Sequence, residues 1–246
     1  MAKKRILVCG ATGFVGRNLA ERLAERDDCE VTGTYFKTEP YPNPKIKFVK
    51  ANLTNKEDVD NVVSGADVIV QVAAVTTGAQ DVVTRPYIHV TDNAIMNARI
   101  LQAAFDHNVP HHIFISCTAM YPPNIGRSLV ETDLDYGAIY GKYFGGAWTK
   151  VYVEKLCEFY SRLKKTKFTV VRHSNVYGPY DKYDLDRSHV FGATITKVVT
   201  NTDGTLLVWG DGSEERDLLY VSDLIDFIES AIGTPEKSDF EIYNVG

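Results

Sequence analysis

The sequence predicts an α/β fold in which a parallel sheet is covered by helices on both faces. Apolar strand-like runs alternate with helix-like segments over the first 179 residues. The run at 67–74 is apolar almost throughout, as parallel strands buried on both faces are. Near the N-terminus an apolar run passes through a glycine-rich turn directly into a helix-like segment. These three observations predict a Rossmann-like, doubly wound parallel sheet.

The elements follow from apolar periodicity and from the residues that bound them. Leu19 and Leu23 recur at helical spacing, Glu57 and Asp58 suit the first turn of a helix, and Pro110 ends a long helix. Strands are expected at 6–9, 30–35, 46–51, 67–74, 111–117 and 167–172, and helices at 17–26, 55–63, 87–108 and 147–164. Past Pro179 the elements are shorter and more polar, with strands expected at 206–209 and 218–221 and a helix at 222–231.

The composition is that of a globular protein with a substantial core. The chain has 246 residues and a net charge of −5, so it offers no electrostatic case for a nucleic-acid or anionic-membrane partner. No apolar run approaches the roughly 20 residues of a membrane span. Four cysteines lie far apart without zinc-like spacing, and Cys9 and Cys157 have apolar neighbours. We expect a reduced, cytoplasmic protein with no metal site.

The glycine turn Gly10-Ala-Thr-Gly13-Phe-Val-Gly16 lies between a strand and a helix, where a dinucleotide fingerprint is found. In such a turn Gly10 permits the sharp bend, Gly13 lets the backbone approach a pyrophosphate, and Gly16 lets the helix pack closely on the strand. The N–H groups at the helix start then hold the phosphates. The alternative is a tight turn that binds nothing.

The end of the second strand bears on which dinucleotide is bound. An acidic residue there would hydrogen-bond the ribose 2′-hydroxyl of NAD. Residues 34–38 include no acidic residue, and the first one is Glu39. Lys37 is placed to meet a 2′-phosphate instead. The sequence therefore predicts NADP, with NAD as the alternative.

Seven landmarks in order make the whole chain resemble the extended short-chain dehydrogenase/reductases, specifically the nucleotide-sugar epimerases, dehydratases and reductases. They are the glycine turn, Gln71-Val-Ala-Ala74, Phe114-Ile-Ser-Cys-Thr-Ala-Met-Tyr121, Arg172-His-Ser-Asn-Val-Tyr-Gly-Pro179, Trp209-Gly-Asp-Gly212, Arg216-Asp-Leu-Leu-Tyr-Val221 and Tyr243-Asn-Val-Gly246. Residues 180–190 look most like GDP-fucose synthase and its relatives. Trp209 is interpreted as a core residue rather than part of a nucleotide-binding wall.

The resemblance implies where cofactor and substrate bind. Lys150, which begins a Lys-x-x-x-Glu pattern, corresponds to the lysine that holds the nicotinamide ribose; the alternative is a solvated lysine paired with Glu154. The implied cofactor-binding residues are Gly10, Thr12, Gly13, Phe14, Val15, Gly16, Tyr35, Lys37, Asn52, Leu53, Val72, Ala73, Ala74, Lys150, His173, Asn175 and Val176. Asn175, His189 and Arg216 are the implied substrate-binding residues.

The proton-transfer residues depart from the family pattern. The family has a tyrosine four residues before the lysine, but here that position is Gly146. If 144–147 forms a loop, Tyr143 could turn inward and replace it. Cys117 stands where the family has Ser or Thr, and Thr118 follows it. The expected catalytic residues are Lys150, Tyr143, Cys117, Thr118 and His189, the last matching the family's second acid/base histidine.

The resemblance implies an NAD(P)-dependent oxidoreductase or epimerase acting on a nucleotide-activated sugar. The alternative is a catalytically impaired cofactor-binding regulator of the same fold. We expect an NAD(P)-binding domain over 1–179, with 206–232 packed onto it, and a partial substrate-binding lobe over 180–246. Family members usually continue for several dozen residues, so that lobe is expected to be incomplete, in a fragment or an unusually short member. Pairing of the two long helices with their copies predicts a homodimer.

Overall fold

A computed structural model describes residues 2–76, 84–122, 126–185, 188–207, 212, 215–234 and 238–246. Within these residues the main sheet has seven strands, all parallel, in the order β3-β2-β1-β4-β5-β6-β9. The strands are β1 (Lys4–Cys9), β2 (Cys29–Tyr35), β3 (Ile46–Lys50), β4 (Val68–Gln71), β5 (His111–Cys117), β6 (Lys167–His173) and β9 (Phe240–Val245). The chain order reverses between β1 and β4, so the predicted doubly wound fold is confirmed.

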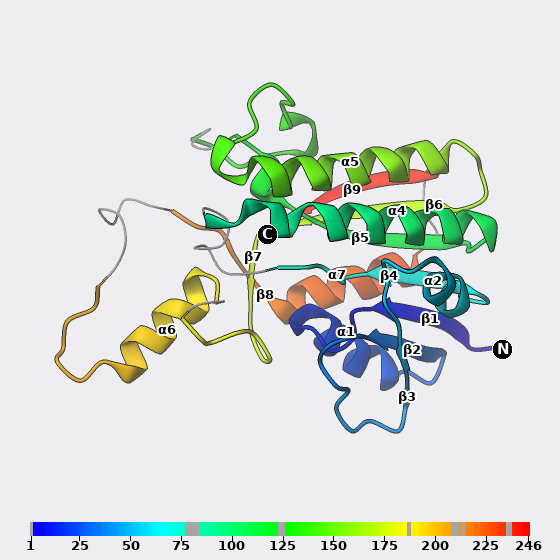
Figure 1. The fold of residues 1–246 in the computed structure, drawn as a ribbon, viewed down its shortest axis with the longest axis horizontal. Coiled ribbons are helices and arrows are strands. Elements are labelled where there is room, and N and C mark those ends of the chain that lie inside the picture. Colours follow the sequence, from blue (N-terminus) through cyan, green and yellow to red (C-terminus); the bar gives the residue numbers. More distant parts are fainter. Residues whose placement is uncertain are drawn as a thin grey trace.

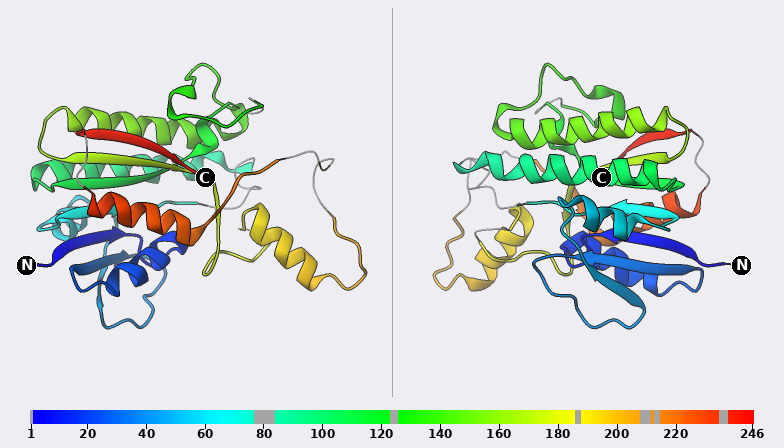
Figure 2. Two further views of the ribbon diagram at one scale, coloured as in Figure 1. Left: turned by 180° about the vertical axis from the view of Figure 1, so that it is seen from behind. Right: turned by 45° about the vertical axis from the view of Figure 1, so that its right-hand side comes forward.

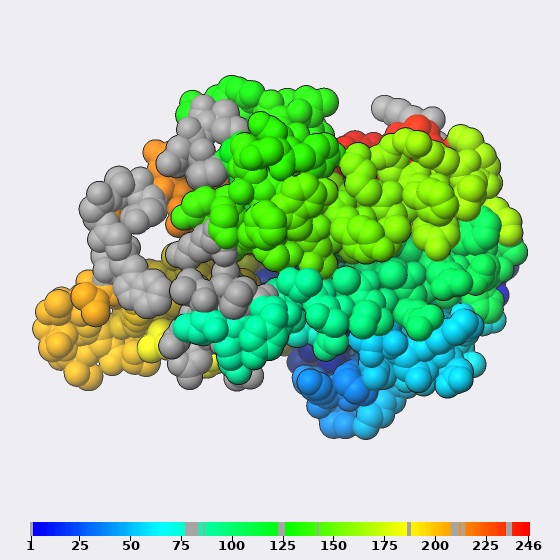
Figure 3. All heavy atoms as spheres, turned by 45° about the horizontal axis from the view of Figure 1, so that its top comes forward, coloured from blue at the N-terminus to red at the C-terminus, as the bar shows by residue number. Residues whose placement is uncertain are grey.

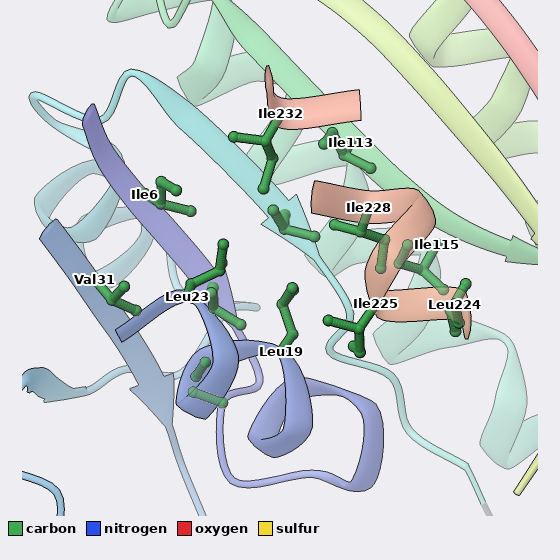
Figure 4. Close-up of a cluster of buried hydrophobic side chains, with 14 of the residues drawn as sticks. Ile6, Leu19, Leu23, Val31, Ile113, Ile115, Leu224, Ile225, Ile228 and Ile232 are labelled. Atoms are coloured by element: carbon green, nitrogen blue, oxygen red, sulfur yellow. The ribbon is translucent and has the colours of Figure 1, made fainter. Parts of the chain in front are cut away.

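Helices cover both faces of this sheet (Figures 1 and 2). Helices α1 (Phe14–Ala24) and α7 (Val221–Gly233) pack on one face, and α2 (Lys56–Val63), α4 (Thr91–Asp106) and α5 (Phe144–Ser161) pack on the other. Side chains of β1 alternate between the layers: Ile6 lies in the α1/α7 core, while Leu7 lies in the α2/α4 core. Figure 4 shows α1 and α7 meeting over the sheet through Leu19, Leu23 and the isoleucines of α7.

Several elements differ from the sequence-based boundaries. Helix α1 begins at Phe14 rather than residue 17, and β4 ends at Gln71 rather than residue 74. The predicted helix 87–108 is a 3₁₀ turn, η1 (Pro86–His89), followed by α4. Helix α5 begins at Phe144 rather than residue 147, so Gly145 and Gly146 form part of its first turn instead of a loop. The intrinsic cost of a helical glycine, about 1 kcal/mol, is offset here because Ala147 and Val151 are buried against Met120.

The chain after β6 contributes to both the sheet and a peripheral region. Strands β7 (Asn175–Tyr177) and β8 (Leu218–Tyr220) form a separate parallel pair, and α6 (Val190–Thr200) stands away from the main sheet (Figures 1 and 2). Residues 206 and 207 are not in a strand, whereas 208–211, including Trp209, lie outside the described residues. Strand β9 pairs with β6, so residues 240–245 form part of the main sheet. The sequence predicts instead that the domain containing this sheet ends at residue 179.

Candidate functional site

The glycine turn between β1 and α1 forms a cradle that side chains would fill. Gly10 has φ of +83°, and a Cβ on it would lie 2.8 Å from the Ala73 Cα. A Cβ on Gly16 would collide with the carbonyl oxygen of Gly10. Gly13 is the N-cap of α1 and provides no capping side chain, and the first turn has no acidic residue. These features fit a bound pyrophosphate, held by the helix-start N–H groups.

Two neighbouring strands support this turn. Thr34, near the end of β2, accepts a hydrogen bond from the Gly10 N–H on its hydroxyl (2.9 Å) and one from the Ala11 N–H on its carbonyl (2.9 Å). Gln71, at the end of β4, donates to the Ala73 carbonyl at 3.2 Å. The predicted residues Val72 and Ala73 are therefore held against the glycine turn at the switch point of the sheet. The sequence did not indicate Thr34, which needed the β1–β2 pairing to be known.

Lys150 lies on α5 at the carboxyl end of β5. Its ammonium donates to the Ile115 carbonyl oxygen at 2.7 Å and lies 4.7 Å from the centre of the Phe114 ring. Burial lowers the pKa of Lys150, while the Cys117 thiol and the Glu154 carboxylate act in the opposite direction. Lys150 is thus directed toward the sheet edge rather than into a surface pair with Glu154.

Cys117 and His173 end β5 and β6 and are paired in register. Both are half-buried. Burial lowers the pKa of His173 to about 4, and the charge of Lys150 acts in the same direction. The His173 ring, whose Nδ1 lies 2.6 Å from the Ser174 carbonyl oxygen, is therefore neutral at pH 7. Lys150, Cys117 and His173 form one cluster at this edge. Thr118 is the residue after Cys117 in the chain.

A buried ion pair fixes the helix that carries Lys150. Arg172 and Glu154 are 3% and 4% exposed, and the Arg172 Nη2 lies 2.7 Å from a Glu154 oxygen. Ser116 donates to Glu154 at 2.6 Å, and Arg172 also donates to the Tyr121 hydroxyl at 2.7 Å. Tyr121 in turn donates to Asn244 of β9 at 2.8 Å. The network joins β5, α5, β6 and β9, and the sequence analysis missed its positioning role because it requires the β5–β6 register.

Tyr143 is not brought to Lys150 by a glycine bend, because α5 is already helical at Phe144. Tyr143 is the N-cap residue of α5, is 38% exposed, and packs edge-on against the Tyr140 ring at 5.7 Å. Among the described contacts none joins Tyr143 to Lys150. Its role as proton carrier therefore stays a prediction without the backbone bend on which it was based.

The remaining predicted residues lie around the cradle and the cluster. Tyr35 is half-buried and Lys37 is exposed after β2, while Leu53 is buried beside Asn52, whose carboxamide oxygen accepts from the Thr54 hydroxyl at 2.8 Å. Thr12, Phe14 and Val15 of the turn are half-buried, and Ala74 is exposed.

Three predicted substrate residues belong to the peripheral region. The Asn175 side chain donates to the Asp217 carbonyl at 3.0 Å, beside buried Val176. His189 is the exposed N-cap of α6, and Arg216 precedes β8, donating to the Glu215 carbonyl at 2.7 Å. None of these contacts reaches Lys150, but the charge of His189, like that of Lys150, acts to lower the pKa of His173, so His189 faces the cluster. The substrate-binding roles of all three stay predictions.

Three further findings concern the described part of the chain as a whole. It contains no group of three or more His, Cys, Asp or Glu residues that could hold a metal ion. None of its helices is both long enough and apolar enough to span a membrane. Cys9 and Cys157 are fully buried, as expected, and all four cysteines are free thiols.

Comparison with known proteins agrees with this architecture. The chain is 28% identical to GDP-L-colitose synthase of Yersinia pseudotuberculosis, over 98% of its own length and 76% of that protein. It is 29% identical to a GDP-L-fucose synthase of Azorhizobium caulinodans, over 95% and 72% of the two chains. The structure of UDP-glucuronic acid 4-epimerase from Bacillus cereus, in complex with UDP-glucuronic acid and NAD, superimposes with a TM-score of 0.84 at 25% identity, covering 98% and 77%. Residues 6–246 match the profile of the NAD dependent epimerase/dehydratase family. The chain belongs to that family.

Proposed function

We propose that this protein oxidises, reduces or epimerises a nucleotide-activated sugar at a ring carbon, using NAD or NADP. One observation carries the proposal: the glycine cradle and the Lys150–Cys117–His173 cluster lie at the same carboxyl edge of one sheet. A bound nicotinamide supplies or accepts the hydride in such a reaction. The relatives that act on GDP- and UDP-sugars support the substrate class.

Each group of residues has a role that follows from its position in the fold. The first-turn amides of α1 hold the pyrophosphate, and the Lys150 ammonium holds the nicotinamide ribose. Cys117 and Thr118, at the end of β5, lie where a hydroxyl or thiol would steady the reacting oxygen. The candidates for moving the proton are Tyr143, Cys117, Thr118 and His189. Asn175, His189 and Arg216 bind the sugar nucleotide.

Lys37 supports NADP as the preferred cofactor. It is exposed just past the end of β2, and no acidic residue precedes Glu39 in that segment. A lysine bound to a 2′-phosphate contributes roughly 1.5–3 kcal/mol, about tenfold to over a hundredfold in affinity. Lys37→Asp should therefore shift the preference toward NAD, measured as the ratio of the two dissociation constants. A wild-type protein that already binds NAD more tightly contradicts this choice.

An apolar face on α4 and α5 supports a homodimer. The two helices lie side by side on one face of the molecule (Figure 3). Ile95 of α4 and Tyr152 and Phe159 of α5 are 40%, 50% and 54% exposed. Twofold pairing of this face would bury these side chains. The molar mass from light scattering at micromolar concentration tests the pairing, and a monomer counts against it.

The test of function is turnover of a panel of UDP-, GDP- and dTDP-sugars with NAD, NADP and their reduced forms. Nicotinamide absorbance reports net oxidation or reduction, and NMR of the recovered sugar reports epimerisation, which leaves the cofactor unchanged. Lys150→Met should abolish turnover. Lys155→Met is the matched control, because Lys155 lies on the same helix and pairs with Glu158 at the surface. A protein that binds cofactor but converts no sugar refutes the proposal.

A further inference from the structure

Gly146 leaves space on the face of α5 that carries Lys150. The two positions are four residues apart, so they lie one helical turn from each other on the same face. Outside the helix's own backbone, a Cβ built on Gly146 would find one atom within 4 Å among the described residues, the Cβ of His89 at 3.9 Å. That is an ordinary van der Waals separation. His89 therefore borders the space beside Gly146.

His89 is held at the cofactor edge of the sheet through Asn93. The Asn93 amide donates to the His89 carbonyl at 2.9 Å and to the Val75 carbonyl at 3.0 Å, and its oxygen accepts from the Val75 N–H at 2.9 Å. Val75 directly follows the segment that packs against the glycine turn. η1, which ends at His89, also packs against α5. The backbone of the half-buried His89 is thus fixed between the end of β4 and the first turn of α5.

We infer that His89 is a catalytic residue that carries the proton in place of the tyrosine absent at position 146. The inference rests on the proposed function, because only a reaction at a carbonyl or carbinol needs this proton. Imidazole is the side chain best suited to accept and donate a proton near neutral pH. A thiol such as Cys117 is a weaker hydrogen-bond donor, and Tyr143 lies three residues before position 146, edge-on to the Tyr140 ring.

The step balances in either direction. In reduction, the carbonyl carbon gains a hydride with its electron pair, the C=O π pair moves to oxygen, and that oxygen takes the N–H proton of the His89 imidazolium. The products are a C–H bond, an O–H bond and a neutral imidazole, which regains its proton from water. In oxidation, neutral His89 takes the hydroxyl proton as the hydride leaves the carbon.

The experiment compares His89→Gln, Gly146→Tyr, the double variant His89→Gln with Gly146→Tyr, and the control His107→Gln at the far end of α4. We expect His89→Gln to lower kcat by about 10²–10⁴-fold without changing the cofactor dissociation constant, and His107→Gln to keep kcat within about twofold of wild type. Adding Gly146→Tyr to His89→Gln should restore at least about tenfold, because the phenol enters the same space. The pH profile of the restored activity should then follow a phenol instead of an imidazole.

A readout independent of turnover is the NMR signal of the His89 ring, assigned by backbone-to-side-chain correlation in the wild type. It should shift in Gly146→Tyr, which places a ring against it, and on addition of a nucleotide sugar that the protein binds. An unmoved signal overturns the inference, even if His89→Gln fails to fold.

The kinetic outcomes separate the inference from the proposed function. Wild-type turnover with a fully active His89→Gln overturns the role of His89 and leaves the function standing. An inactive wild type that becomes active as Gly146→Tyr shows that the site lacks a proton carrier, which also overturns the role of His89. If neither protein converts any sugar, the proposed function and this inference fall together.

Discussion

His112 on β5 makes the stability of this protein sensitive to mild acid. Its side chain is 1% exposed and its ring lies 5.5 Å from that of Phe168. Among the described residues neither ring nitrogen has a hydrogen-bond partner. Burial, helped by the charge of His111, lowers the pKa of His112 from 6.5 to about 3. The folded protein therefore keeps this ring neutral under conditions in which the unfolded chain protonates it.

The sign and size follow from linkage. Between pH 6.5 and about 3 the unfolded state binds one more proton at His112 than the folded state does, so the free energy of unfolding falls as the pH falls. Each pH unit in that window costs about 1.4 kcal/mol. Lowering the pH from 7 to 4.5 should remove about 2.5 kcal/mol through His112 alone. Above the unfolded pKa the loss disappears.

Replacing His112 with Leu isolates this contribution. The variant should lose about 2.5 kcal/mol less than wild type between pH 7 and 4.5, measured by urea unfolding at each pH. At pH 7 it should also be more stable by about 1–3 kcal/mol, because two buried nitrogens without partners are removed. Ile113→Val on the same strand is the control: it should cost about 0.5–1.5 kcal/mol at every pH. Parallel pH curves for wild type and His112→Leu would refute the reasoning.

Two further predictions concern the cradle and the ion pair. Gly13→Val should abolish dinucleotide binding, measured by calorimetry. It should leave the fold intact, because a Cβ at this position meets only the Gly10 carbonyl oxygen, at 3.3 Å. Gly141→Val is the control, because a Cβ on Gly141 would have no neighbour within 4 Å, and unchanged affinity in Gly13→Val would contradict the site. Glu154→Gln should lower the free energy of unfolding by about 3–5 kcal/mol, because Arg172 is left buried without its carboxylate. Glu154→Leu combined with Arg172→Met should cost less than Glu154→Gln alone, and a larger loss in urea unfolding would reject the charge explanation.

The sheet was predictable because its information is local. Continuous apolar runs such as β4 and β5 match buried parallel strands, and the glycine turn has a steric requirement that other residues fail. Helix α6 was not expected, since its Val, Ile and Thr residues favour strands and only one of its residues, Gly192, is buried. The start of α5 was placed too late because two glycines suggest a loop, whereas packing of Ala147 and Val151 maintains the helix.

The site was predictable only where one segment carries it. Lys150 and the glycines are recognisable from their own neighbours in the sequence. Thr34, Asn93 and the Glu154–Arg172 pair depend on which strands and helices become adjacent, and a single sequence does not give that pairing. Ser116 and Arg172, for example, lie opposite each other in the β5–β6 register. Their distance in the chain hides a contact that the sheet makes direct.

The anchoring of α5 explains why position 146 can change while Lys150 stays in place. Two consecutive turns of the helix are tied to the end of β5: Glu154 through Ser116, and Lys150 through the Ile115 carbonyl. Gly146 lies one turn before this tied region, next to His89. A residue introduced there leaves both of these ties in place. Substitution at position 146 is therefore expected to leave Lys150 in place, whereas loss of the Glu154–Arg172 ion pair is expected to move the helix.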